Sequence, residues 1–112
     1  MPSSQFPIPQ GALDMLILQT LSLEPAHRYG IAQRLEQISR SVVHVNQGSL
    51  YPAPHRLEQK GWLQPGWKQS ETGREARLYS LTRSGKRQLA TEKESWARLT
   101  GAVQVIFDQG TQ

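Results

Sequence analysis

The pattern of hydrophobic and polar positions predicts helices at both ends of the chain and a short stretch of alternating residues between them. The most apolar segment runs from Gly11 to Leu23. It predicts a helix that is buried on most sides, either in the domain core or against another subunit. Pro25 ends this helix, since the residue before a proline is pushed out of the helical region. The apolar residues of its broad face are Leu13, Met15, Leu16, Ile17, Leu18 and Leu21.

A second amphipathic helix is predicted from Arg28 to Arg40, because apolar residues recur there at three- and four-residue spacing. The residues of this inner face are Ile31, Leu35 and Ile38. Three valines follow closely, and β-branched residues favour extended structure. We therefore expect one short strand after the helix. Its residues are Val42, Val43 and Val45.

The segment from Asn46 to Gly61 predicts a third helix with one apolar stripe and a polar outer face. The stripe consists of Leu50, Ala53 and Leu57, and the outer face of Gln47, Ser49, Pro52, His55, Arg56 and Gln59. Three helices with short connections, the third polar outside, outline a helix-turn-helix. Amide, hydroxyl and guanidinium groups on such a helix suit base edges and phosphates. An ordinary surface helix has the same polar pattern, so this helix alone does not establish DNA binding.

Two prolines fall inside this third helix. Each removes a backbone donor, and each ring crowds the carbonyl four residues earlier. If the helix begins near Ser49, Pro52 lies in the first turn, where no donor is needed. Pro54 is slightly too deep for that explanation, so we expect an irregular or kinked start.

Two strand-like runs follow, from Trp62 to Gln69 and from Ala76 to Leu81, with a polar, glycine-containing loop between them. A basic hairpin directly after a helix-turn-helix is the winged-helix arrangement. The basic residues of this wing, which are placed to reach a phosphate backbone, are Lys68, Arg74 and Arg77. Standing alone, the hairpin would be an ordinary solvated one. Its place after the third helix favours the wing.

Thr82 is a good N-cap for a last helix that meets no proline before Asp108. Its apolar residues form a heptad seam, interrupted only by Glu92. The seam residues are Leu89, Trp96, Leu99, Val103 and Ile106. A helix of about 25 residues is about 37 Å long, more than so small a domain covers, so the seam predicts a homodimer. The alternative is that the helix folds back on the first helix of its own chain.

These elements predict a mainly α fold with a small β-hairpin, namely a winged helix-turn-helix with a long C-terminal dimerisation helix. The expected organisation is a flexible, Pro-rich arm over residues 1–10, a winged-helix DNA-binding domain over 11–81, and the dimerisation helix and tail over 82–112. At 112 residues, one domain is the natural size.

The composition of the chain indicates which class of molecule it binds and in which compartment it works. The net charge of +4 and a pI near 9.9 favour an acidic partner, most commonly nucleic acid. The chain has no cysteine, which excludes disulfides and thiolate zinc sites and fits a reducing cytoplasm. The longest apolar run, from Met15 to Leu18, is too short to span a bilayer, and the N-terminus lacks the features of a signal peptide. We expect a cytoplasmic protein without membrane association.

No constellation for catalysis, a cofactor or a metal emerges. No phosphate-cradling glycine loop is present, and Ser49 and Ser84 have no evident base. His27, His44 and His55 are far apart in sequence. A pair formed by His55 with the carboxylate three residues later is half of a metal motif, but neighbouring basic residues oppose cation binding. We therefore expect no enzyme.

Three motifs in order resemble the PadR-like family of bacterial transcriptional regulators. They are Tyr29-Gly30-Ile31, then Gly48-Ser49-Leu50-Tyr51-Pro52-Ala53 with His55-Arg56-Leu57-Glu58, and Tyr79-Ser80-Leu81-Thr82 with Gly85. The resemblance runs from about Gly11 to the C-terminus and is closest to the smaller subfamily with a single C-terminal helix. It implies a winged helix that binds operator DNA as a homodimer, usually as a repressor. The chain departs from the family pattern at Pro54, where a leucine-like residue is usual, and at Arg28, where glycine is common.

The expected DNA contacts divide by their position on the fold. The third helix enters a major groove, with Gln47, Ser49 and Tyr51 near base edges or phosphates and His55 on the same helix. The phosphate backbone contacts are Arg56, Lys60 and Lys68, with Arg74 and Arg77 from the wing. A two-fold dimer would read a palindromic operator with half-sites about 34 Å apart. The competing interpretations are a non-specific architectural DNA-binding protein and a protein–protein adaptor built on the same fold.

The resemblance also implies release from DNA by a small molecule. Some small members bind flat aromatic compounds at the dimer centre, which the first and last helices line. For this chain the resemblance places a candidate effector site at Trp96, with Met15, Leu18 and Val103 as neighbours. A tryptophan on a heptad seam is also an ordinary core residue, so a purely structural role for Trp96 is the alternative.

Overall fold

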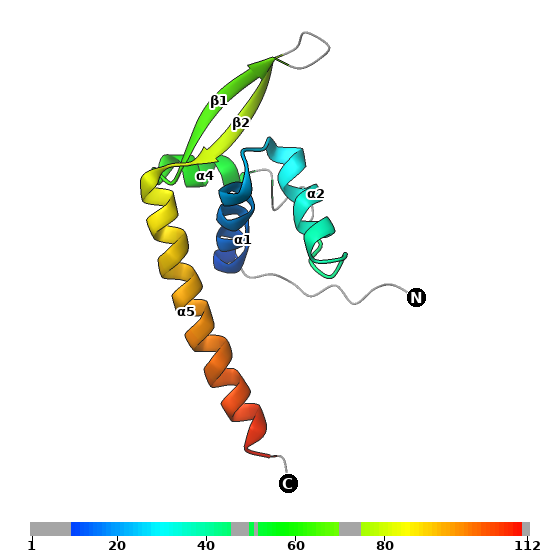
Figure 1. Cartoon of the computed structure of the whole chain (residues 1–112), viewed down its shortest axis with the longest axis vertical. Helices are drawn as coiled ribbons and strands as arrows, with labels where there is room; N and C mark the ends of the chain where they lie inside the picture. Colours follow the sequence, from blue (N-terminus) through cyan, green and yellow to red (C-terminus); the bar gives the residue numbers. More distant parts are fainter. Residues whose placement is uncertain (1–9, 46–49, 51, 70–74, 111–112) are drawn as a thin grey trace.

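The computed structural model describes residues 10–45, 50, 52–69 and 75–110 of the chain. The helices and strands follow the order α1 (Gln10–Leu23), α2 (Arg28–Ile38), α4 (Ala53–Gln59), β1 (Leu63–Gln69), β2 (Glu75–Leu81) and α5 (Arg83–Asp108). The helices α1, α2 and α4 form the body, the β1–β2 hairpin projects from one end, and α5 runs away toward the other (Figure 1). This arrangement confirms the predicted winged helix with a long C-terminal helix.

One core holds the body together, and α1 passes through its centre. Ile17 and Leu18 of α1, Ile31 of α2 and Leu57 of α4 are all fully buried in it. The broad apolar face predicted for α1 explains this, because a helix that is apolar on most sides has to be covered on most sides. Leu89 of α5 joins the same cluster, so the start of the last helix belongs to the body.

The hairpin pairs antiparallel, with Leu63 opposite Leu81 and Trp67 opposite Arg77. A feature missed from the sequence is that Ala26, in the connection between α1 and α2, adds a bridge to Tyr79 on the free side of β2. The backbone N–H and C=O of Tyr79 both bond to Ala26, at 2.9 and 3.2 Å. Pro65 lies opposite Tyr79 on β1, where its missing donor removes no bond between the strands. The strand β2 is therefore held on both sides.

The end of α2 corrects two predictions. Ile38, expected on the inner face, is 63% exposed, because α2 ends there and the chain turns away from the core. The expected strand over residues 42–45 is also wrong, since a turn over residues 39–41 leads into bends at 42 and 43 and irregular backbone at 44 and 45. The backbone is left-handed at Arg40 and Ser41, with φ of 54° and 68°. Local polar bonds stabilise this turn in place of strand pairing.

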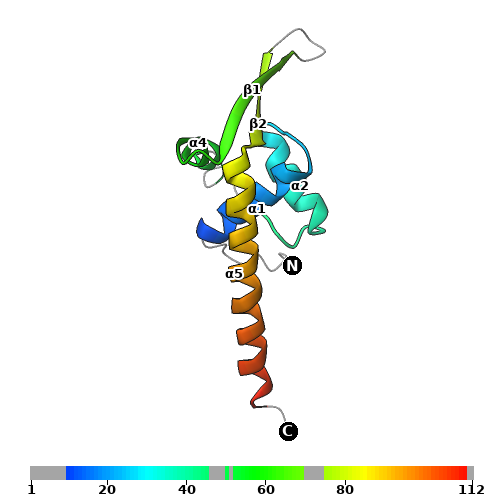
Figure 2. The same cartoon turned by 60° about the vertical axis from the view of Figure 1, so that its left-hand side comes forward.

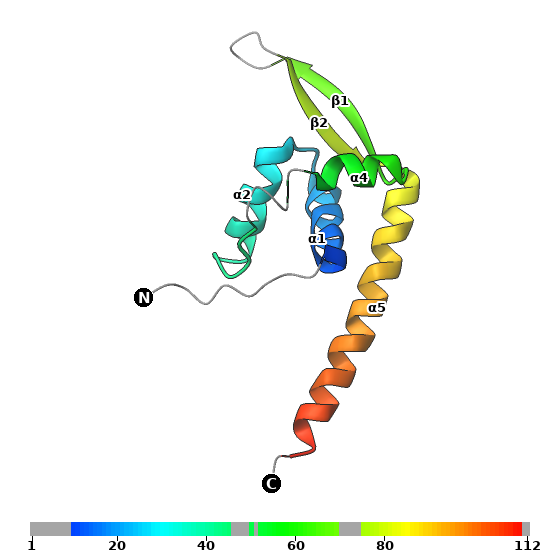
Figure 3. The same ribbon diagram turned by 180° about the vertical axis from the view of Figure 1, so that it is seen from behind.

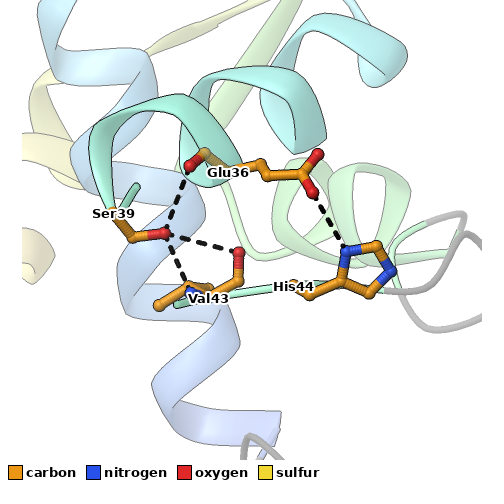
Figure 4. Close-up of polar contacts among 4 residues, drawn as sticks. All are labelled: Glu36, Ser39, Val43 and His44. Carbon is orange, nitrogen blue, oxygen red and sulfur yellow. Dashed lines mark hydrogen bonds and ion pairs between the residues drawn. The ribbon is translucent and has the colours of Figure 1, made fainter. Parts of the chain in front are cut away.

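Those bonds are seen in Figure 4. The hydroxyl of Ser39 accepts a bond from the backbone N–H of Val43 at 2.9 Å. Beside it, Nδ1 of His44 lies 3.4 Å from Oε1 of Glu36. Side-chain bonds to nearby backbone compete with extended structure, and here they outweigh the β propensity of the valines.

Most of the predicted beginning of the third helix, residues 46–49 and 51, lies outside the described residues, and Leu50 between them is helical. The helix α4 begins at Ala53, with Pro52 as its N-cap. Pro54 is then its second residue, where an N–H group has no partner within the helix anyway. The ring of Pro54 is fully buried, so it packs into the core where other residues of the helix also point. Pro54 therefore fits the first turn of α4, while the predicted start near Ser49 lies outside the described residues.

The start of α5 is fixed by close packing. Thr82 caps the helix as predicted, its hydroxyl accepting a bond from the N–H of Gly85 at 2.9 Å. A Cβ on Gly85 would lie 2.1 Å from the carbonyl oxygen of Trp62. That carbonyl also accepts a bond from the N–H of Thr82 at 3.1 Å. Only glycine allows the two backbones to approach this closely.

Candidate nucleic-acid interface

The helix α4 lies across one end of α1, at the base of the hairpin (Figure 3). Ala53, Pro54 and Leu57 point into the core. Because these three residues are buried, Pro52, His55 and Gln59 lie on the opposite side of the helix, where all three are exposed. A polar stripe on a short helix beside a hairpin is the surface that a winged helix presents to DNA.

The guanidinium of Arg56, expected at a phosphate, is paired within the protein. Its Nη2 lies 2.5 Å from Oδ1 of Asp14 in α1. The side chain of Asp14 is only 9% exposed and that of Arg56 is 28% exposed. A buried carboxylate requires a charged partner, so this ion pair links α4 to the central helix of the core. A phosphate contact by Arg56 stays a prediction.

Arg77 of β2 is also paired, with Glu58 on the other flank of α4. Its Nη2 is 3.0 and 3.2 Å from the two carboxylate oxygens. The guanidinium carbon lies 5.5 Å from the ring centroid of Tyr79, within cation–π range. The same residue that was expected on the wing thus connects the wing to α4, and its phosphate contact also remains a prediction.

The other predicted DNA contacts fall into three groups. His55 and Lys60 are exposed at α4, and Nζ of Lys60 lies 5.0 Å from the ring centroid of Trp62. Lys68 is on β1, opposite Ala76. The remaining predicted contacts lie outside the described residues. They are Gln47, Ser49, Tyr51 and Arg74.

The seam of α5 is exposed beyond its first turns. Leu89 is buried in the core, Val103 is half-buried, and Trp96, Leu99 and Ile106 are 45%, 55% and 67% exposed. Figure 2 shows α5 extending beyond the body with no described element of the chain covering its far half. Large apolar side chains at heptad spacing on an uncovered helix are typical of a helix–helix interface.

A groove of about 220 Å³ lies between α1 and α5. Met15 and Trp96 from the predicted effector site line it together, whereas Leu18 is fully buried and Val103 is not part of the lining. The other lining residues are Gly11, Ala12, Glu92, Ser95 and Leu99. Beside the groove, Lys93 of α5 donates to the side-chain carbonyl of Gln19 in α1 at 3.3 Å. The part of α5 nearest the body therefore does pack toward α1.

Three acidic residues that sequence reasoning left unassigned contribute to these surfaces. Asp14 is the only charged residue between Gly11 and Leu23, a signal that could have identified it. Glu58 was considered only as a neighbour of His55. Glu92 interrupts the seam, and its Oε2 is buried without a hydrogen-bond partner among the described residues.

Within the part of the chain that the structure describes, no three His, Asp or Glu side chains are grouped so as to hold a metal ion. None of the helices described is both long and apolar enough to cross a membrane.

The sequence of the chain is similar to that of a known protein. The chain is 40% identical over 89 residues to an uncharacterized 37.1 kDa protein in transposon TN4556 of Streptomyces fradiae. That match covers 80% of this chain but 24% of the relative, so the chain spans about a quarter of its length.

Two solved structures have the same fold over nearly their whole length. A PadR-like transcription factor from Bacteroides fragilis is 32% identical with a TM-score of 0.72, and the match covers 87% of this chain and 91% of the other. A PadR-like transcriptional regulator from Bacillus cereus is 26% identical with a TM-score of 0.75, covering 88% and 93%. The sequence profile of the transcriptional regulator PadR-like family matches residues 17–91. The chain therefore belongs to the PadR-like family of DNA-binding transcriptional regulators, as the sequence motifs indicated.

Proposed function

We propose that the protein is a homodimeric, sequence-specific repressor that a small-molecule effector releases from DNA. The observation that carries this proposal is the uncovered apolar seam of α5. Trp96, Leu99 and Ile106 share one helical face and stay 45%, 55% and 67% exposed, and no described element covers the far half of α5. A second copy supplies an identical seam, so two α5 helices bury both faces at once. Residues 82–112 then serve as the dimerisation element and 11–81 as the DNA-binding domain.

In the proposed complex, each α4 helix enters a major groove of a palindromic operator. The polar stripe that contains His55 faces the bases, together with the segment just before α4 that carries Gln47, Ser49 and Tyr51. Lys60 and the basic wing residues Lys68 and Arg74 neutralise phosphates. These lysine and arginine contacts provide most of the affinity, while the stripe and the preceding segment provide sequence preference.

The groove between α1 and α5 supports the effector part of the proposal. It combines an indole ring with methionine and leucine side chains, a lining that suits a small aromatic compound. The groove is formed by the helix that dimerises and by α1, which also contacts α4 through Asp14. An effector that changes the angle between the long helices would change the spacing of the two α4 helices, and with it the fit to half-sites.

The direct test is a titration at physiological salt. The purified protein first selects duplexes from a random library, and its affinity for a selected duplex is compared with that for a scrambled duplex of the same composition. We expect a preference of at least about 10³, with two chains bound per site. Equal affinity for both duplexes would favour the alternative of a non-specific architectural protein, and one chain per site would contradict the homodimer. A reporter controlled by the selected duplex should be less active when the protein is present.

The wing contributes a first specific prediction. Arg74→Ala should weaken binding to selected and scrambled duplexes alike, because a phosphate contact carries no sequence information. The slope of log affinity against log salt should fall by about one. Arg98→Ala is the matched control, since Arg98 is an exposed arginine on α5 whose ion pair with Glu94 spans 3.9 Å. An unchanged slope for Arg74→Ala would remove this residue from the interface.

A further inference from the structure

The helix α4 carries an ion pair on each of its two flanks. Arg56 reaches Asp14 of α1, and Glu58 reaches Arg77 of β2. Residues two apart on an α-helix are about 200° apart around its axis, so the two partners pull on opposite flanks. The exposed stripe of Pro52, His55 and Gln59 lies between them, away from the core.

We infer that Asp14 and Arg77 are positioning residues that fix the rotation of α4 about its axis, and thereby which side chains face the bases. The inference rests on the proposed function, because it concerns sequence-specific binding by α4. Neither residue needs to contact DNA for this role. Each acts through its partner on α4, Arg56 or Glu58.

The burial of Asp14 makes its ion pair with Arg56 costly to break. The side chain is 9% exposed, so an unpaired carboxylate at this place would be costly, and Arg56 is held at its oxygen at 2.5 Å. Asp14 stands on α1 between Leu13 and Met15, which are both buried. A rotation of α4 would pull Arg56 from this carboxylate while α1 stays fixed in the core.

Arg77 holds the other flank of α4, and its guanidinium plane is fixed by two neighbours. One of its nitrogens bonds both oxygens of Glu58, and the face of Tyr79 lies against the guanidinium. Both residues belong to β2, whose pairing with β1 on one side and with Ala26 on the other makes it the best-held strand of the hairpin. Two rigid elements therefore hold a helix of only seven residues, which is too short to be stable by itself.

The test compares two duplexes, one selected from a random library by the unmodified protein and one scrambled. Arg77→Gln and Asp14→Asn should each reduce the ratio of affinities by about tenfold or more, the size of one lost base contact, by weakening binding to the selected duplex. Affinity for the scrambled duplex should change little. Arg34→Gln is the control, because it breaks an ion pair with Glu24 in the connection between α1 and α2, away from α4.

A reversed pair separates positioning from direct contact. Glu58→Arg combined with Arg77→Glu keeps an ion pair between α4 and β2, so it should restore most of the ratio lost in Arg77→Gln. If Arg77→Gln weakens both duplexes equally and the reversed pair restores nothing, Arg77 contacts phosphate and the inference is overturned. If circular dichroism shows that Asp14→Asn does not fold, the inference is tested with the variants of Glu58 and Arg77 alone. If the unmodified protein prefers neither duplex, the proposed function fails instead.

Discussion

The first turns of α5 and its last turns belong to one continuous helix, yet they are stabilised in different ways. At the start, Thr82 caps the helix, Gly85 lies against the backbone of Trp62, and Leu89 is buried in the core. At the end, Ile106 and Phe107 are 67% and 68% exposed. Contacts within the chain hold the first part. The second part has apolar residues at the same spacing but no described residues to cover them.

One heptad pattern along α5 therefore serves two purposes. Leu89 and Ile106 both occupy the seam, but only Leu89 is covered by the chain's own core. The change occurs near Glu92 and Trp96, where α5 leaves α1 and the groove opens. Substitutions before this point should therefore affect folding of the chain, whereas those after it should affect association of two chains.

The largest effect is expected at the start of the helix, for Gly85→Ala. The added Cβ would lie 2.1 Å from a backbone carbonyl oxygen, which no side-chain movement relieves. We expect a loss of about 3 kcal/mol or more in the free energy of unfolding, from overpacking that displaces α5. Chemical denaturation followed by circular dichroism measures it.

The control is Gly101→Ala, further along the same helix, where an added Cβ meets no atom within 4 Å. That variant should be neutral or slightly more stable, because alanine favours a helix over glycine by about 1 kcal/mol. Equal stabilities for Gly85→Ala and Gly101→Ala would show that the packing of α5 on Trp62 does not limit folding.

A smaller effect on folding, but a large one on assembly, is expected for Trp96→Glu. A carboxylate on the seam would have to be buried without a partner in the dimer, at a cost of several kcal/mol. Light scattering should then give the mass of one chain at micromolar concentration, while the winged helix stays folded. Thr91→Glu adds the same charge at an exposed position outside the seam and should remain dimeric. If Trp96→Glu remained dimeric, the seam of α5 would not be the dimer interface.

The sequence predicted most of the fold because periodicity reports which face of each element is buried. It placed α1, the hairpin and α5 to within one or two residues, and it identified Thr82 as a cap. It failed where a bond between distant residues or a local turn decides the structure. The bridge from Ala26 to Tyr79 and the turn at Ser39 belong to this class.

The functional site was harder to predict from the sequence than the fold was, for the same reason. Arginines on a predicted DNA-binding surface were assigned to phosphates, since sequence gives their charge but not their partners. Arg56 is 42 residues from Asp14, and Arg77 is 19 residues from Glu58. No periodicity connects such positions. Asp14, the one charge in the apolar segment from Gly11 to Leu23, would have been the useful signal, because a buried charge requires a partner.

The smallest expected effect is also the sharpest test of the comparison within α5. Val105 and Ile106 are neighbours with similar exposure, at 59% and 67%, but only Ile106 lies on the seam. In a single chain, serine at either place should change stability by at most about 0.5 kcal/mol. In a dimer, Ile106→Ser removes two buried side chains and should weaken association about tenfold or more, while Val105→Ser leaves it unchanged. Sedimentation at several concentrations measures both constants. Equal values would mean that the dimer, if one forms, does not use this seam, and that the far half of α5 is covered by something else.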